Sequence, residues 1–193
     1  MSGTLLYLHG FTSGPASHKA QALKARVAQR GGATVFVCPQ LSHSPRAAVD
    51  LAEDLIAAGA PPVTLVGSSL GGYYATWLAQ RHPDAVRGVV LVNPAVVAHL
   101  SLHEFIGPQT NLYTGERFDF TSAHVDELRA LEVPALAHPE RFWLLAEKGD
   151  ALLDYRQAVA KYQGARQTVL DGGDHSFTRW DEFLDAIAAF AGG

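Results

Sequence analysis

Cysteine is almost absent from this sequence, because only one of the 193 residues, Cys38, carries a thiol. A single cysteine excludes an internal disulfide and a metal site built from several cysteines. Chains without disulfides are typical of a reducing compartment, so we expect a cytoplasmic protein. Cys38 ends an apolar run and Pro39 follows it, and we interpret it as a small core residue.

The sequence also lacks the features that direct a chain to a membrane or to nucleic acid. Residues 1–10 contain no basic segment with a long apolar core behind it, so we expect no secretory signal. No apolar run reaches the roughly 18 to 20 residues of a membrane-spanning helix, and we expect no membrane insertion. A formal net charge of −4 gives no basic surface for nucleic acid. We expect one soluble domain over residues 1–193.

The sequence does contain short apolar runs that alternate with longer helical patterns. Near-continuous apolar runs of four or five residues are typical of parallel strands covered on both faces. These runs are Thr4–Leu8, Thr34–Cys38, Val63–Val66, Gly88–Val92, Phe142–Ala146 and Gln167–Leu170. The helical patterns between and after them are His18–Gln29, Pro45–Ala58, Leu70–Arg81, Ala151–Tyr162 and Asp181–Phe190. This alternation predicts an α/β fold with a mostly parallel sheet of about six strands and helices on both faces.

One connection is too long for a plain crossover. The stretch from Asn93 to Glu140 contains a segment that we interpret as a loop, Gly107 to Thr121, and a predicted helix from Ser122 to Leu131. An insertion at the carboxyl side of a parallel sheet lies where ligands bind. We therefore expect either a cap over a site at about residues 95–140 or a long crossover.

The strongest local motif is Gly67-Ser68-Ser69-Leu70-Gly71-Gly72, at the junction of a predicted strand and a predicted helix. A sharp strand-to-helix turn of this kind presents a serine hydroxyl above the sheet, and small residues on either side let the strand and the helix approach. Only Ser69 has glycine two residues before and two residues after it. A phosphate-binding loop is excluded because no Gly-Lys-Ser/Thr sequence follows. We interpret Ser69 as a nucleophile.

A serine needs a base, and His175 is the candidate. On folds with this turn, the base follows the last strand and an acid lies between nucleophile and base in the sequence. His175 lies in the stretch Asp171–Phe177, directly after the last predicted strand. The alternative is a surface histidine in a loop.

The acid that would orient the imidazole is predicted in the loop after the run Phe142–Ala146. Asp150 occupies that loop, and Asp154, one turn further along, is the alternative. An aspartate just before a helix is also an ordinary N-cap, so neither role is decided by the sequence.

Two backbone N–H groups are expected to bind the oxyanion. One belongs to Leu70, the residue after the nucleophile, and the other to Phe11, in the loop after the first strand. We expect the neighbouring His9 to shape that loop rather than to act as a second base or a metal ligand. The remaining histidines show no His-Glu-x-x-His motif or paired ligand spacing, and we expect no metal and no cofactor.

Several of these segments together resemble one known family, the YqiA-like esterases, which are bacterial α/β-hydrolases. The similar segments run through nearly the whole chain: Tyr7–Phe11, Ser17–Ala20, Val66–Ala75, Val92–Val96, Asn111–Glu116, Leu153–Arg156 and Gly172–Phe177. The resemblance implies a single-domain α/β-hydrolase fold without the two leading strands of larger hydrolases. It also implies esterase or thioesterase action on a small acyl substrate, with Ser69 and His175 matching the nucleophile and the base.

The family pattern does not decide between the two candidate acids. Where it commonly reads Gly-Asp-Glu-Val-Leu-Asp-Tyr, this chain has Ala151 and Leu152 in place of Glu and Val and keeps both aspartates. Two alternatives to an esterase stay open: an amide or carbon–carbon bond hydrolase with the same three residues, and a binding protein that keeps the fold without turnover.

Overall fold

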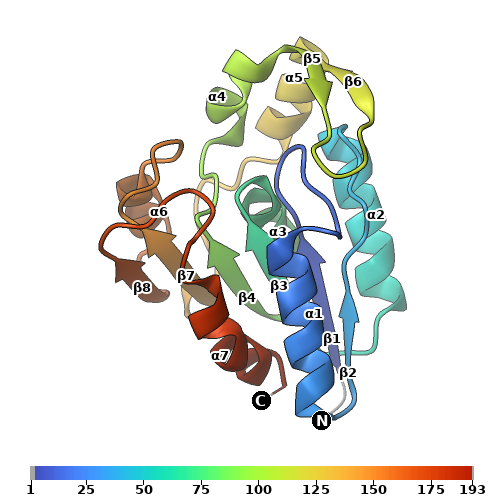
Figure 1. The fold of residues 1–193 in the computed structure, drawn as a ribbon, viewed down its shortest axis with the longest axis vertical. Coiled ribbons are helices and arrows are strands. Elements are labelled where there is room, and N and C mark those ends of the chain that lie inside the picture. The colour runs from blue at the N-terminus through green and yellow to red at the C-terminus, as the bar shows by residue number, and fades with distance from the viewer. Residues whose placement is uncertain (1–2, 193) are drawn as a thin grey trace.

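The computed structural model describes residues 3–192 and arranges their strands in two sheets (Figure 1). The main sheet has six strands in the order β2-β1-β3-β4-β7-β8, and all neighbours in it run parallel. Its strands are β1 (Gly3–Leu8), β2 (Thr34–Val37), β3 (Val63–Ser68), β4 (Val86–Val92), β7 (Phe142–Glu147) and β8 (Arg166–Leu170). The predicted α/β class and strand number are confirmed. Residues 1, 2 and 193 of the predicted domain lie outside the described part of the chain.

Helices cover both faces of this sheet (Figure 1). On one face, α1 (His18–Arg30) packs against α7 (Trp180–Gly192), and the other face carries α2 (Pro45–Ala58), α3 (Leu70–Arg81) and α6 (Tyr155–Lys161). Side chains alternate along β1, so that Leu5 and Tyr7 belong to the core under α1 and α7, whereas Leu6 and Leu8 belong to the opposite core. Burial on both faces explains why the four inner strands are nearly continuous apolar runs, whereas the edge strands β2 and β8 are only partly buried.

Most of the stretch between β4 and β7 forms a separate layer at the carboxyl ends of the strands (Figure 1). Its elements are α4 (Ala98–Ser101), the 3-10 turn η1 (His103–Phe105), β5 (Gly107–Thr110), β6 (Arg117–Phe120) and α5 (Ser122–Ala130). The 3-10 turn η2 (Pro139–Arg141) lies at the opposite end of the sheet, directly before β7, where Arg141 donates to the carbonyl of Pro83 (2.6 Å). The layer is anchored to the main core, because Phe120, Val125 and Leu128 are buried in it. The Tyr73 hydroxyl in α3 also donates a hydrogen bond to the carbonyl of Leu128 (2.8 Å).

Two sequence predictions are wrong in detail. The stretch Gly107 to Thr121 is not a loop, because β5 and β6 pair in it as an antiparallel hairpin. The helix predicted from Ala151 to Tyr162 begins only at Tyr155. Its expected first turn is instead held by the Asp150 carboxylate, which accepts hydrogen bonds from the N–H groups of Leu152 and Leu153 (both 2.9 Å).

No helix within residues 3–192 combines the length and the apolar character needed to cross a lipid bilayer.

Candidate active site

Ser69 occupies the turn between β3 and α3 in a strained backbone conformation, with φ +54° and ψ −120°. The turn is held by its own main chain, because the Ser69 N–H donates to the carbonyl of Val92 (3.0 Å) and its carbonyl accepts from Ala95 (3.1 Å). A Cβ on Gly71 would lie 1.9 Å from the carbonyl oxygen of Leu8, and a Cβ on Gly67 would lie 2.4 Å from that of Gly71. The two glycines therefore permit the close approach that the motif predicts.

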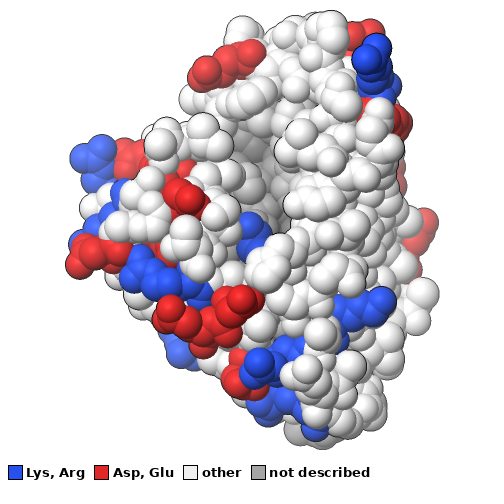
Figure 2. All heavy atoms as spheres, in the orientation of Figure 1, with Lys and Arg blue, Asp and Glu red and all other residues white. Residues whose placement is uncertain are grey.

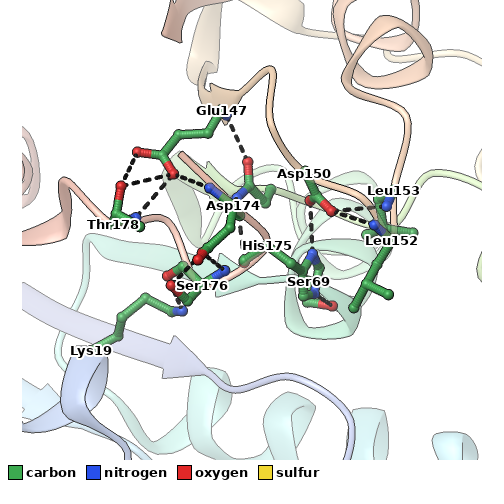
Figure 3. Close-up of polar contacts among 11 residues, drawn as sticks. Lys19, Ser69, Glu147, Asp150, Leu152, Leu153, Asp174, His175, Ser176 and Thr178 are labelled. Atoms are coloured by element: carbon green, nitrogen blue, oxygen red, sulfur yellow. Dashed lines mark hydrogen bonds and ion pairs between the residues drawn. The ribbon is translucent and has the colours of Figure 1, made fainter. Parts of the chain in front are cut away.

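His175 lies in the loop after β8, and its ring is hydrogen-bonded at both nitrogens (Figure 3). Nδ1 lies 2.7 Å from Asp150 Oδ2, and Nε2 lies 3.0 Å from Ser69 Oγ. A carboxylate only accepts hydrogen bonds, so the proton is on Nδ1 and Nε2 is free to accept the serine proton. The structure thus brings together three side chains that are separated by up to 106 residues in the sequence.

Asp150, not Asp154, is the aspartate that contacts His175. Its side chain is 2% exposed. Burial opposes ionisation of Asp150, but hydrogen bonds from His175 and from the N–H groups of Leu153 and Leu152 outweigh it, and its pKa is lowered.

Asp154 has a different role, because it caps α6 through the N–H of Arg156 (3.0 Å) and pairs with the guanidinium of the same residue. These contacts hold the Asp154 pKa below its ordinary value. The structure does not bring Asp154 into contact with the imidazole.

The two predicted oxyanion donors lie next to Ser69. Leu70 is the first residue of α3, so its N–H has no partner within the helix. The N–H of Phe11 makes no hydrogen bond to any residue in the described range. The loop that carries Phe11 runs past the serine, because a Cβ on Gly10 would lie 3.2 Å from Ser69 Cβ. Both amides therefore lack a partner among the described residues and belong to segments that adjoin Ser69.

His9 shapes this loop, as the sequence suggested. It is 4% exposed, its Nδ1 donates to the carbonyl of Gly10 (2.9 Å), and its Nε2 accepts from the N–H of Leu41 (3.0 Å). Burial lowers the pKa of His9, although the bond to Gly10 acts in the opposite sense. A neutral ring with both nitrogens occupied has no capacity left for a metal or a substrate proton.

A pocket that is partly open to solvent extends from the two oxyanion donors to the β5–β6 hairpin. Its lining includes Phe11, Thr12, His43, Leu70, Tyr74 and Phe118. Phe11 packs edge-on against Phe118 and Phe120, and His43 stacks on Phe118 with ring centroids 4.6 Å apart. In the space-filling view, a hollow opens on the face that Figure 1 presents (Figure 2).

Two buried polar residues of the site were missed by the sequence analysis. Glu147 ends β7 and is 0% exposed, and Asn93 directly follows β4 and is 4% exposed. Both contact the loop that carries His175. The available signal was a carboxylate directly after the apolar run Phe142–Ala146 and an amide directly after the run Gly88–Val92.

Among residues 3–192, no group of three or more His, Cys, Asp or Glu side chains is arranged to hold a metal ion.

Comparison with known proteins identifies one family and several solved structures that have the same fold. A family model described as "Uncharacterised protein family (UPF0227)" matches residues 4–192, and it corresponds to the YqiA-like family. Est1E from Butyrivibrio proteoclasticus superposes with a TM-score of 0.74 at 15% identity, covering 98% of this chain and 86% of that one. A monoacylglycerol lipase from Paleococcus ferrophilus gives a TM-score of 0.70 at 17% identity, covering 97% and 93% of the two chains. The mouse alpha/beta hydrolase domain-containing protein 10 gives 0.70 at 16% identity, covering 98% and 89%. At these identities the likeness establishes the α/β-hydrolase fold.

Proposed function

This chain belongs to the UPF0227, or YqiA-like, family of α/β-hydrolase fold, and from this premise we propose that it is a serine hydrolase that cleaves carboxylic esters. One observation carries the proposal: the His175 imidazole accepts from the Ser69 hydroxyl at 3.0 Å while it donates to Asp150 at 2.7 Å. A serine hydroxyl is a weak nucleophile until an adjacent base takes its proton, and His175 is that base in this arrangement.

The proposed reaction passes through an acyl-enzyme. Ser69 Oγ attacks the ester carbonyl while His175 Nε2 takes the hydroxyl proton, and Asp150 stabilises the imidazolium that forms. The N–H groups of Phe11 and Leu70 bind the oxyanion. The imidazolium then protonates the departing alcohol oxygen as the C–O bond breaks. A water molecule, deprotonated by the same ring, attacks the acyl carbonyl, and the acid is released as Ser69 regains its proton.

The ester is the first substrate to test, and a thioester is the second. One of the proteins that share the fold is named a monoacylglycerol lipase, and such a lipase acts on a carboxylic ester. A Ser-His-Asp triad can cleave esters, thioesters and amides, so the choice among these substrates depends on the pocket beside Phe11 and Leu70.

A fluorophosphonate probe with mapping of the adduct tests the nucleophile. We expect a stoichiometric adduct on Ser69, and no adduct in the Ser69→Ala variant. Ser68→Ala is the matched control, because it also removes one hydroxyl but belongs to the buried end of β3, and it should still react. An adduct on Ser68, or no adduct on a folded protein, refutes the proposal.

Matched substrates test the bond that is cleaved. Of an ester, a thioester and an amide of the same short acyl group, we expect the wild type to hydrolyse the ester fastest. The Ser69→Ala variant should lose about 10^6-fold in kcat on that ester, the loss typical of a serine triad. Normal folding without turnover of any of the three would favour a binding protein on this fold.

A further inference from the structure

The Glu147 carboxylate is fully buried and takes no part in the proposed reaction, yet five donor atoms of one segment converge on it. Figure 3 shows the contacts from Asp174 and Thr178. It accepts from the N–H groups of Asp174 (2.9 Å), Thr178 (3.0 Å) and Arg179 (3.3 Å). It also accepts from the Thr178 hydroxyl (3.0 Å) and from Nε of Arg179 (3.1 Å). All five donors flank His175, one on its N-terminal side and four on its C-terminal side.

The loop fits this carboxylate closely. Gly173 has φ +72°, and a Cβ added there would lie 1.9 Å from Glu147 Oε2. Behind it, the N–H of Gly149 donates to the carbonyl of Gly172 (2.8 Å), which joins the loop of the candidate acid to that of the candidate base. The main chain before His175 therefore lies directly against the carboxylate.

Asn93 holds the same loop from the neighbouring strand. Its Nδ2 donates to the carbonyls of Asp174 (2.9 Å) and His175 (3.3 Å), and its Oδ1 accepts from the N–H of Glu147 (2.9 Å). Because its partners are two carbonyls and one N–H, only one orientation of the amide satisfies them. Asn93 itself has φ +40°, a conformation that asparagine tolerates better than most residues.

We propose that Glu147 and Asn93 are positioning residues that hold the main chain around His175 so that its imidazole keeps both hydrogen bonds. The inference concerns the same site and depends on the proposed hydrolase function. The chemistry of each side chain suits the role, since five donors require an acceptor without protons and two carbonyls require a donor. Other charged groups also face this loop. Arg179 contacts Glu147 directly, and Lys19 of α1 donates to the carbonyl of Ser176 (2.7 Å).

Ionisation of Glu147 agrees with this arrangement. Burial alone would raise its pKa, but the hydrogen bonds from Asp174, Thr178 and Arg179 outweigh burial, and the pKa is lowered. The carboxylate is therefore charged at neutral pH, which makes each of the five hydrogen bonds charge-assisted.

Isosteric variants distinguish the effect of the hydrogen bonds from the effect of side-chain size. Glu147→Gln keeps the shape but presents an NH2 group to the donors of the loop, and Asn93→Asp keeps the acceptor but loses the donor to Asp174 and His175. In each, we expect the rate constant of fluorophosphonate reaction at Ser69 and the kcat for an ester to fall by about 10- to 100-fold, because a displacement near 1 Å costs that much. KM should stay within about twofold, since neither side chain lines the pocket.

A control and a milder variant distinguish this role from general stability. Tyr162→Phe removes a buried hydrogen bond to Thr76 (2.8 Å) in the core under α6, so it should lower the melting temperature and leave the rate constant unchanged. Thr178→Val removes one donor to Glu147 at an exposed residue, so it should fold and should lower the rate constant less than Glu147→Gln does.

Proton NMR gives a readout that a purely structural role would not move. The His175 Nδ1 proton that bridges to Asp150 should give a far-downfield resonance in the wild type, and this resonance should broaden or disappear in Glu147→Gln while the methyl resonances of the core stay in place. The inference is overturned if the folded variants react at the wild-type rate or keep that resonance, or if Tyr162→Phe loses as much reactivity at equal loss of stability. A wild type without reaction at Ser69 refutes the proposed function itself, and the positioning role with it.

Discussion

The choice between the two aspartates can be tested by replacing each with asparagine. Asp150 is 2% exposed and accepts hydrogen bonds from His175 Nδ1 (2.7 Å) and from two main-chain N–H groups (both 2.9 Å). Asparagine keeps the volume and one oxygen, but it removes the charge that stabilises the imidazolium and lets the ring adopt the wrong tautomer. The equivalent change in a serine protease triad lowers kcat about 10^4-fold, which corresponds to about 5.4 kcal/mol of transition-state stabilisation.

The matched change Asp154→Asn should have almost no effect on rate. The Asp154 side chain is 35% exposed, its ion pair with Arg156 lies at the surface, and asparagine is itself a good N-cap. We expect a loss of less than about 1 kcal/mol in the free energy of unfolding and a kcat within about twofold of the wild type.

Steady-state hydrolysis of one ester, measured on both variants together with urea denaturation, decides the matter. A loss of activity in Asp154→Asn that equals or exceeds the loss in Asp150→Asn would refute the assignment of the acid, provided that both variants are folded.

Three further predictions concern other parts of the site and the core. Gly71→Ala should lower the rate of reaction at Ser69 at least about 100-fold and also lower the melting temperature, because the new Cβ would lie 1.9 Å from the Leu8 carbonyl and must push the oxyanion loop from α3; an unchanged rate contradicts this. The Asp150 pKa is lower in the folded protein than in the unfolded chain, so its stabilising effect is complete above the unfolded value of about 3.9 and is lost as the pH falls through the lower folded value. Urea midpoints from pH 2 to 6 should therefore fall more steeply for the wild type than for Asp150→Asn, and parallel curves would refute the linkage. Burial raises the Cys38 pKa to about 12, so iodoacetamide at pH 8 should label the thiol in urea but not in the folded protein, and rapid labelling of the native chain would contradict its burial.

The four inner strands β1, β3, β4 and β7 could be predicted because parallel strands buried on both faces leave a nearly continuous apolar run. The edge strands β2 and β8 are only partly buried and carry a weaker signal. The strand-to-helix turn at Ser69 could also be recognised in the sequence, because the close backbone contacts at positions 67 and 71 require glycine there. Strand ends were less certain. Glu147 belongs to β7 although it is charged, and only its long-range hydrogen bonds explain its burial.

The hairpin and the helix start could not be predicted for physical reasons that lie outside the local pattern. In β5 and β6 each strand has only four residues, and a polar-apolar alternation such as Arg117–Phe120 is too short to distinguish from a loop. The residues after Asp150 have helical propensity, but the aspartate carboxylate takes two of their N–H groups. The decision between Asp150 and Asp154 likewise depends on which loop faces His175, a tertiary contact that no spacing within the sequence encodes.

The order of the strands has a consequence for how such proteins can change. Ser69, Asn93, Asp150 and His175 follow β3, β4, β7 and β8, four strands that are successive neighbours in the sheet. The hairpin that completes the pocket comes instead from a single excursion of the chain between β4 and β7. Replacing the segment between β4 and β7 by one of another length would change the wall of the pocket but leave the four adjacent strands that carry the reacting groups unchanged. Substrate selectivity can therefore change in evolution without a change in the residues that cleave the bond.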